Sequence, residues 1–276
     1  MTKPIIRLIL SDIDGTLLNT NHEVTPELKG VMAEVCAQEI PFVLTSARSP
    51  LGMTKIQEEL GLKTPLAAYN GAYISDYQAK KPFFSLPVDL VEAKKVILRA
   101  FHSYPHVAIN IYAGEKWVVP KRNQWVIAEE KITGMKAEEV ELNRFLAQEP
   151  EIHKVLFIAT NEEIATLENS LSKIVLLESS SYRSKENYLE FTHKKISKAL
   201  ALEKLAEYYQ VPLSNTMAIG DHDNDAGMIG AAGMGIAMAN GSVAARNKAD
   251  FITADNNHNG VAIVLKQLVS LAKRED

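Results

Sequence analysis

Cysteine is nearly absent from this chain, which has a single one, Cys36, among 276 residues. One thiol excludes an internal disulfide. Cys36 falls on an apolar stripe with helical spacing, so we expect it to be a small core residue rather than a reactive thiol.

Long hydrophobic runs are absent as well. No apolar stretch approaches the ~20 residues that a membrane-spanning helix needs. The first residues enter a short strand-like run that Arg7 interrupts. We therefore expect no signal peptide, no membrane partner and a cytoplasmic protein.

A large excess of one charge is the third absence. The chain has 30 Lys and Arg against 34 Asp and Glu, a net charge of −4, and no basic block. This balance argues against nucleic acid as a partner, because no global field attracts phosphates. With 46% hydrophobic residues the chain can bury a core, and its length suits one large domain or two moderate ones. Nothing in the sequence specifies an oligomeric state.

Short apolar runs alternate with helical patterns in the first and last parts of the chain. The first part reads as strands at 5–10, 41–44 and 66–69 and helices at 26–36 and 52–60. The last part reads as strands at 216–219, 235–239 and 251–253 and helices at 198–209, 225–232 and 261–273. This rhythm predicts an α/β fold, a Rossmann-like parallel sheet with helices on both faces.

The rhythm changes between residues 83 and 187. This segment reads as a hairpin of 106–112 with 116–119, helices at 90–102 and 138–148, and strands at 154–159 and 173–177. We expect an inserted α+β domain at 83–187 and a core domain made of 1–82 and 188–276. The polar stretch 179–187 is a predicted hinge.

Two acidic clusters, DIDGT at residues 12–16 and GDHDND at residues 220–225, each follow an apolar run. Carboxylates crowded at the end of a buried strand repel one another and lose hydration, so such a cluster requires a neutralising cation. Oxygen ligands favour a hard divalent ion, and Mg²⁺ suits a site that also holds a phosphate. The clusters predict a Mg²⁺ site with Asp12 as the nucleophile.

The second cluster has two other interpretations. Its aspartates match the opening of an EF-hand loop, but Ala226 and Ala232 stand where that loop needs Gly and Glu. The glycines that follow lack the spacing of a dinucleotide-binding fingerprint. What remains is an acidic strand-to-helix turn in which Asp221 is the best metal ligand, since it directly follows the strand.

The other members of this turn have lesser predicted roles. Asp225 is expected to ligate the metal or to orient it through water, and Asn224 to donate to a phosphate oxygen. Asp223 reads as an exposed acid at a helix start, and His222 as a solvated turn residue.

Four predicted strands end in polar groups, at Asp12, Ser46, Asn70 and Asp221. Ligands of open parallel sheets bind outside the carboxyl ends of the strands, so these groups predict one site. Asp12 and Asp14 can divide two tasks, with one attacking and the other moving a proton. The alternative is a plain turn rich in Asp and Gly.

Three further positions complete the predicted site. Ser46 with Arg48 suits a phosphate-binding turn, although an N-cap beside a surface arginine has the same pattern. Asn70-Gly71 fits the same site or a plain turn. Lys198 stands at a predicted helix start, where a cation opposes the dipole, so it either serves Asp12 and the phosphoryl group or is solvated.

Together these motifs resemble the haloacid dehalogenase superfamily, specifically its Cof-like branch with a large α/β cap. The DIDGTL segment at residues 12–17 is similar to the first motif of that family. The resemblance implies that Asp12 is the nucleophile and a Mg²⁺ ligand. It also implies that Asp14 is the acid and base and that its main-chain carbonyl binds the metal.

The later motifs follow in the family's order: Ser46-Ala47-Arg48, Asn70-Gly71, Ile196-Ser197-Lys198 and the 220–225 segment. Ala47 and Ala199 stand where glycine is frequent. The last motif implies Asp221 as a metal ligand, Asn224 near the phosphate and Asp225 in support.

The resemblance implies a Mg²⁺-dependent phosphatase that acts through an aspartyl-phosphate. Its expected substrates are small phosphomonoesters such as sugar phosphates or phosphorylated cofactors, with the cap choosing among them. Two alternatives are a phosphomutase, which shares the intermediate, and a non-catalytic protein that binds a phosphorylated metabolite.

Overall fold

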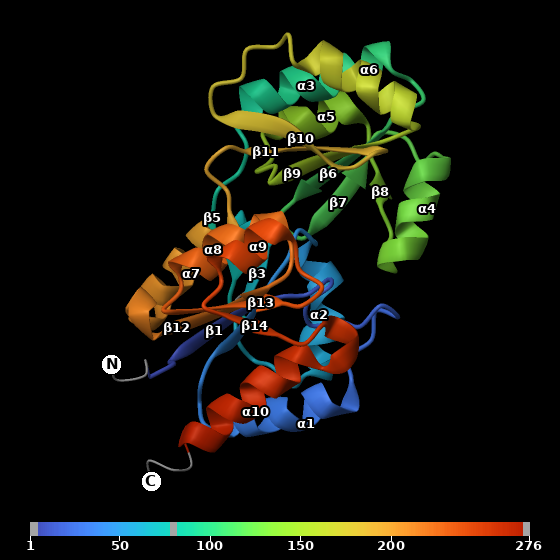
Figure 1. The fold of residues 1–276 in the computed structure, drawn as a ribbon. Coiled ribbons are helices and arrows are strands. Elements are labelled where there is room, and N and C mark those ends of the chain that lie inside the picture. Colours follow the sequence, from blue (N-terminus) through green and yellow to red (C-terminus); the bar gives the residue numbers. More distant parts are fainter. Residues whose placement is uncertain (1–4, 78–81, 273–276) are drawn as a thin grey trace. The chain divides into compact units, whose positions relative to one another are not determined.

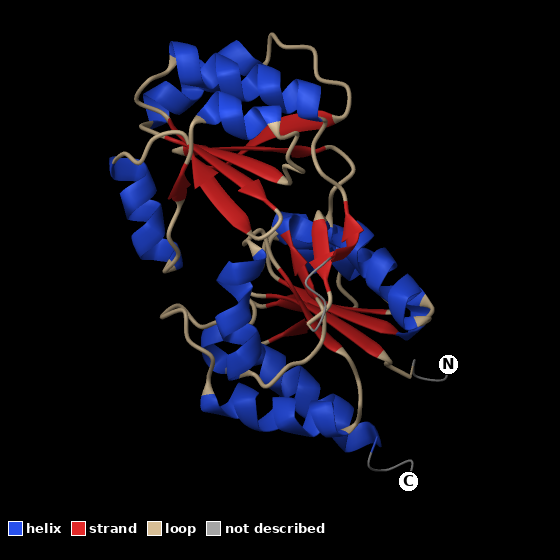
Figure 2. Cartoon of the chain, turned by 180° about the vertical axis from the view of Figure 1, so that it is seen from behind, coloured by secondary structure: helices blue, strands red, loops and turns tan. Residues whose placement is uncertain are grey.

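The chain forms two compact units, shown from two sides in Figures 1 and 2. The computed structural model describes residues 5–77 and 82–272. The first unit contains the described residues up to Arg48, Met53–Phe84 and those from Ser197 onward. The second contains Ser49–Gly52 and Ser85–Ile196.

The first unit is built on an eight-stranded sheet in the order β14-β13-β12-β1-β2-β3-β4-β5. The strands are β1 Leu8–Asp12, β2 Phe42–Thr45, β3 Leu66–Ala68, β4 Tyr73–Ser75, β5 Pro82–Ser85, β12 Thr216–Gly220, β13 Met234–Met238 and β14 Phe251–Thr253. The six strands from β14 to β3 are parallel, and β4 is antiparallel to β3. The predicted α/β class with a parallel sheet core is therefore confirmed.

Helices cover both faces of this sheet (Figure 1). They are α1 Pro26–Ala37, α2 Pro50–Glu59, α7 Lys198–Tyr209, α8 Ala226–Ala231, α9 Val243–Lys248 and α10 Gly260–Ala272. Helices α1 and α10 pack against each other, whereas α7, α8 and α9 lie over the opposite face. Lys273, the predicted end of the last helix, lies outside the described residues.

Helix α1 begins as its sequence predicts. The Thr25 side chain accepts a hydrogen bond from the Leu28 N–H, and Pro26 takes the first helical position. The expectation for Cys36 is wrong, because its side chain is exposed. It follows Val35, the last buried residue of the helix, by about 100° of helical rotation, which carries it off the buried stripe.

The second unit is built on a six-stranded sheet in the order β10-β11-β9-β6-β7-β8. Its strands are β6 Ala108–Ala113, β7 Lys116–Val119, β8 Glu138–Glu139, β9 Lys154–Ile158, β10 Ser179–Lys185 and β11 Tyr188–His193, and its helices are α3 Leu90–Ser103, α4 Gln124–Thr133, α5 Leu142–Ala147 and α6 Asn161–Leu171. All pairs are antiparallel except β7 with β8. Helices α3, α5 and α6 cover one face (Figures 1 and 2).

The second unit follows the sequence predictions only in part. The hairpin of β6 with β7 is confirmed. The helix expected at 138–148 is instead β8 followed by the shorter α5, which Glu141 caps. No strand forms at 173–177, where the chain turns after α6.

The segment expected to be a hinge, 179–187, is mostly strand β10. It pairs with β11, which pairs with β9, so residues 188–196 fall in the second unit although the sequence placed them in the core. The reason is hydrogen bonding, since β11 completes this antiparallel sheet. Within residues 5–77 and 82–272, no helix combines the length and apolar character that a bilayer crossing requires.

Candidate active site

The predicted site residues all belong to the first unit and follow the carboxyl ends of its strands or open α7. Asp12 is the last residue of β1, and Asp221 directly follows β12. Because β1 and β12 are adjacent and parallel, the two acidic clusters meet at one edge of the sheet, although about 200 residues separate them. Asp12, Asp221 and Asp225 are all buried.

A buried lysine lies among these carboxylates. Lys198 Nζ donates to Asp12 Oδ1 and to Asp225 Oδ1, both at 2.5 Å. Its position is set by Ser197, whose hydroxyl accepts the Leu200 N–H and caps α7. Lys198 is 2% exposed, so the reading of a solvated lysine is wrong for this geometry.

Burial and charge act in opposite directions on these groups. Burial raises the pKa of Asp12 well above its usual range, Lys198 opposes the rise, and the carboxylates of Asp225 and Asp221 add to it. Burial alone would lower the pKa of Lys198, but Asp12 and Asp225 hold that pKa above its usual range. Burial also raises the pKa of Asp221. The cluster is thus short of positive charge, as a cation-binding site would be.

Asp225 orients the loop that carries Asp221. Its Oδ2 accepts the main-chain N–H groups of Asp221 at 3.0 Å and His222 at 2.8 Å, while Oδ1 accepts from Lys198. Both oxygens are therefore engaged by protein donors. This arrangement suits the supporting role considered for Asp225 better than direct ligation.

The oxygens of the cluster fit a hard cation. Asp12, Asp221 and Asp225 each offer one carboxylate oxygen, and these atoms lie within 4.8 Å of one another. The set contains neither sulfur nor imidazole nitrogen, the donors that softer metals prefer. Asp14 is outside this cluster.

The Asp14 carboxylate is instead held by Arg48. Arg48 Nε donates to Oδ2 at 2.8 Å and Nη2 donates to Oδ1 at 2.6 Å, a bidentate pair. The Arg48 and Asp14 side chains that form this pair are both half-buried. The residue expected to bind phosphate and the residue expected to move a proton are therefore in direct contact.

The remaining predicted residues form a second group. The Asn70 N–H donates to the Ser46 carbonyl at 2.8 Å, and Asn224 Nδ2 donates to Asn70 Oδ1 at 3.3 Å. Gly71 has φ +96°, and a Cβ there would lie 2.7 Å from the Cβ of Ala201 in α7. The Asn70-Gly71 turn thus requires glycine where the helix passes closely.

Comparison with known proteins agrees with this geometry. A family model described as haloacid dehalogenase-like hydrolase matches residues 9–265. The chain belongs to this family. A Haemophilus influenzae protein named "Putative phosphatase" is 33% identical over 265 residues, which cover 95% of this chain and 97% of that protein.

Two further relatives of this haloacid dehalogenase-like hydrolase widen the comparison. The 5-amino-6-(5-phospho-D-ribitylamino)uracil phosphatase YitU of Bacillus subtilis is 26% identical over 275 residues, covering 98% of this chain and 99% of that protein. A solved haloacid dehalogenase-like hydrolase from Bacteroides thetaiotaomicron has a TM-score of 0.86 at 27% identity, over 95% of this chain and 99% of that one. The chain is a hydrolase of the phosphatase class.

Sequence reasoning missed two contacts of this hydrolase's site. Thr16 Oγ1 donates to Asp221 Oδ1 at 2.7 Å, and Asn240 Nδ2 donates to the Gly15 carbonyl at 2.8 Å. Asn240 follows β13 closely, so the rule that singled out Asn70 and Asp221, a polar side chain after a parallel strand, also applies to it.

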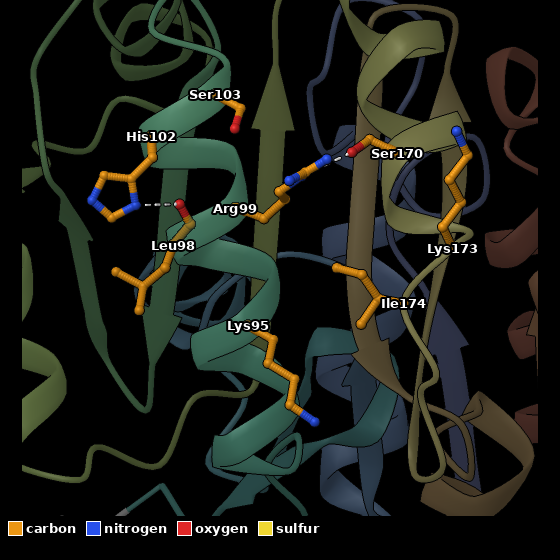
Figure 3. A pocket seen from close by; sticks show the side chains of 8 residues that line it. All are labelled: Lys95, Leu98, Arg99, His102, Ser103, Ser170, Lys173 and Ile174. Atoms are coloured by element: carbon orange, nitrogen blue, oxygen red, sulfur yellow. Dashed lines mark hydrogen bonds between the residues drawn. The ribbon is translucent and has the colours of Figure 1, made fainter.

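A groove of about 590 Å³ lies in the second unit (Figure 3). It is lined by Lys95, Leu98, Arg99, His102, Ser103, Ser170, Lys173 and Ile174. Figure 3 shows Arg99 reaching Ser170, whose Oγ accepts from Nε at 3.1 Å, while Lys95 and Lys173 point apart. None of the eight residues carries a carboxylate, so this groove shares no residue type with the acidic cluster of Asp12, Asp221 and Asp225.

Proposed function

We propose that this chain is a Mg²⁺-dependent phosphatase that hydrolyses small phosphomonoesters through an aspartyl-phosphate. One observation carries the proposal. It is the buried group of Asp12, Lys198, Asp225 and Asp221 at the carboxyl edge of the sheet, with carboxylate oxygens within 4.8 Å of one another. A group of this kind provides a nucleophile, a fixed cation and oxygens for a metal.

In the first proposed step, an Asp12 carboxylate oxygen attacks the substrate phosphorus. The bond from phosphorus to the leaving oxygen breaks, and that oxygen takes a proton from Asp14. The ammonium of Lys198 is 2.5 Å from Asp12 Oδ1, where it stabilises the ionised nucleophile and the incoming phosphoryl oxygens.

In the second step, Asp14 removes a proton from a water molecule that attacks the same phosphorus. The bond from phosphorus to the Asp12 oxygen breaks, which releases inorganic phosphate and restores the carboxylate. Ser46, Arg48, the Asn70-Gly71 turn and Asn224 are the proposed phosphate-binding groups. Because Arg48 pairs with Asp14, a bound phosphate would compete with Asp14 for the guanidinium.

The proposed metal ligands are the carboxylates of Asp12 and Asp221 and the main-chain carbonyl of Asp14, while Asp225 supports the site by holding the Asp221 loop. When bound, Mg²⁺ would neutralise phosphoryl charge as a Lewis acid.

The proposed substrates are sugar phosphates or phosphorylated cofactors. Relatives of this chain include a 5-amino-6-(5-phospho-D-ribitylamino)uracil phosphatase and an HMP-PP phosphatase from Yersinia pseudotuberculosis that is 26% identical over 235 residues. We propose that the second unit acts as the cap that selects among such compounds.

The test is a phosphate-release screen over sugar phosphates, nucleotides and phosphorylated cofactors, with Mg²⁺ and with a chelator. We expect release with Mg²⁺ and its loss with chelator. Asp12→Asn, which cannot attack phosphorus, should be slower by about 10⁴-fold or more. Transfer of phosphate between positions of one sugar without release would indicate a mutase instead, and tight binding without either reaction would indicate a binding protein.

A further inference from the structure

Four asparagines contact the segment that follows Asp14. They come from the loops after β13 and β14. Asn240, Asn256, Asn257 and Asn259 reach Gly15, Leu18, Thr20 and Thr25, so the order of the asparagines matches the order of their partners. Two of these contacts lie next to the site, and the other two lie farther along the segment.

The two contacts next to the site are linked to each other. Asn240 Nδ2 donates to the Gly15 carbonyl at 2.8 Å, and Asn240 Oδ1 accepts the Asn256 main-chain N–H at 3.1 Å. Asn256 Nδ2 donates to the Leu18 carbonyl at 2.9 Å. We call Asn240 and Asn256 the asparagine bracket, because together they hold both ends of the turn at residues 15–18.

The bracketed turn touches the candidate metal ligand directly. Thr16 Oγ1 donates to Asp221 Oδ1 at 2.7 Å. Gly15 has φ +81°, and a Cβ there would lie 2.4 Å from Asp221 Oδ2, so the turn passes close to that carboxylate and only glycine fits at this position. The loop that carries Asn240 also contacts Asp221, because the Ser242 N–H donates to the Asp221 main-chain carbonyl at 2.7 Å.

We infer that the asparagine bracket positions the Asp14–Thr16 turn and, through Thr16, the carboxylate of Asp221. It thereby presets the spacing between Asp12 and Asp221 that a divalent cation needs. Asn240 and Asn256 are positioning residues, since they act through this turn. The inference rests on the proposed function, because it takes Asp14 and Asp221 as working groups.

The test compares Asn240→Ala with Asn257→Ala. Asn257 is a matched control because it is an asparagine next to the bracket whose Oδ1 accepts from Thr20, outside the turn. For each variant, kcat, KM, the Mg²⁺ concentration for half activation and the unfolding temperature with and without Mg²⁺ are measured. The last readout needs no substrate, so it also applies if phosphatase activity is not found.

For Asn240→Ala we expect kcat lower by roughly 10- to 100-fold, KM within about threefold, and a half-activating Mg²⁺ concentration raised about tenfold. The Mg²⁺-induced rise in unfolding temperature should shrink, while Asn257→Ala stays like the wild type. Equal values of these quantities in the two variants would overturn the inference. It would also be overturned if Asn240→Ala lowered only the unfolding temperature without Mg²⁺ and left kcat and the Mg²⁺ dependence unchanged. If Asn240→Ala does not fold, Asn256→Ser removes the Leu18 bond alone and should change the same quantities less.

Discussion

At the scale of single residues, the main feature of the site is that its buried carboxylates outnumber the one buried lysine, Lys198. Lys198 donates to two carboxylates at 2.5 Å, and Asp221 has no contact of this kind with a lysine or arginine among the described residues. Both carboxylate oxygens of Asp225 accept hydrogen bonds from protein groups. Aspartates that looked alike in the sequence therefore differ in their hydrogen-bond partners, and this difference suggests different roles for them.

Replacing Lys198 should destabilise the metal-free protein strongly. Lys198→Met leaves Asp12 and Asp225 buried without their cation, which costs about 3–5 kcal/mol of unfolding free energy. Chemical denaturation in chelator measures this, and Mg²⁺ should restore part of the loss. Lys204→Met is the control on the same helix, since Lys204 pairs with exposed Glu207. Similar unfolding free energies for the two variants would contradict the charge assignment.

At the scale of elements, the parallel strands of the first unit were predictable, whereas its β4, β5 and α9 and several elements of the second unit were not. Strands of a parallel sheet are buried on both faces, so β1, β2 and β12 read as continuous apolar runs. Helix α6 was missed although it has a capping box, Thr160 with Glu163, a signature that the sequence contains.

The strand predicted at residues 173–177 is wrong because this apolar run has no pairing partner among the described residues. Residues 173–177 have strand composition, but Val175 and Leu177 are 77% and 74% exposed, and no strand within residues 5–77 and 82–272 pairs with them. Conversely, β10 is polar and was read as a hinge, yet β11 supplies its hydrogen bonds. Pairing between distant segments cannot be read from local composition, so these elements required the structure.

Replacing glycine by alanine should change the unfolding free energy in opposite directions at two positions, Gly71 and Gly30. Gly71→Ala puts a side chain at φ +96° and within 2.7 Å of Ala201, and should lower the unfolding free energy by roughly 2 kcal/mol or more. Gly30→Ala, in α1 with open space around it, should raise it by about 0.5–1 kcal/mol. Thermal or chemical denaturation measures both. A stable Gly71→Ala protein would contradict the close approach of α7.

The strand β9 begins beside a buried histidine with a defined proton. His153 Nδ1 accepts the Gly114 N–H at 3.0 Å, so the proton is on Nε2, which donates to Ser85 Oγ at 2.9 Å. Burial lowers the pKa of His153 to about 4. Between pH 4 and the ordinary value of 6.5, the unfolded chain binds this proton and the folded chain does not.

Stability should therefore fall as the pH decreases through that window and be fully present above it. The contribution lost is about 3 kcal/mol. The unfolding free energy, measured by denaturation at pH 7 and pH 4, should show this loss in the wild type. His102 is exposed, so His102→Gln should show the same loss, whereas His153→Gln should show a smaller one. A pH dependence unchanged in His153→Gln would refute the neutral, buried histidine.

At the scale of the whole molecule, one sheet edge collects residues from across the sequence. Strand order brings Asp12 next to Asp221 and the Ser46 turn next to Asn70. The positions of these residues could be predicted from motifs and strand ends. The pairing of Asp14 with Arg48 and the asparagine bracket could not, because they depend on side-chain conformations and on loops far apart in the chain.

In the proposed mechanism, Asp12 carries the phosphoryl group during turnover. The direct measurement mixes the enzyme with a ³²P-labelled substrate found in the screen, stops the reaction with acid and maps the labelled peptide. We expect label on the peptide that contains Asp12, stable in acid and lost in alkali, and no label in Asp12→Asn. Label on another residue, or turnover by Asp12→Asn at the wild-type rate, would contradict it.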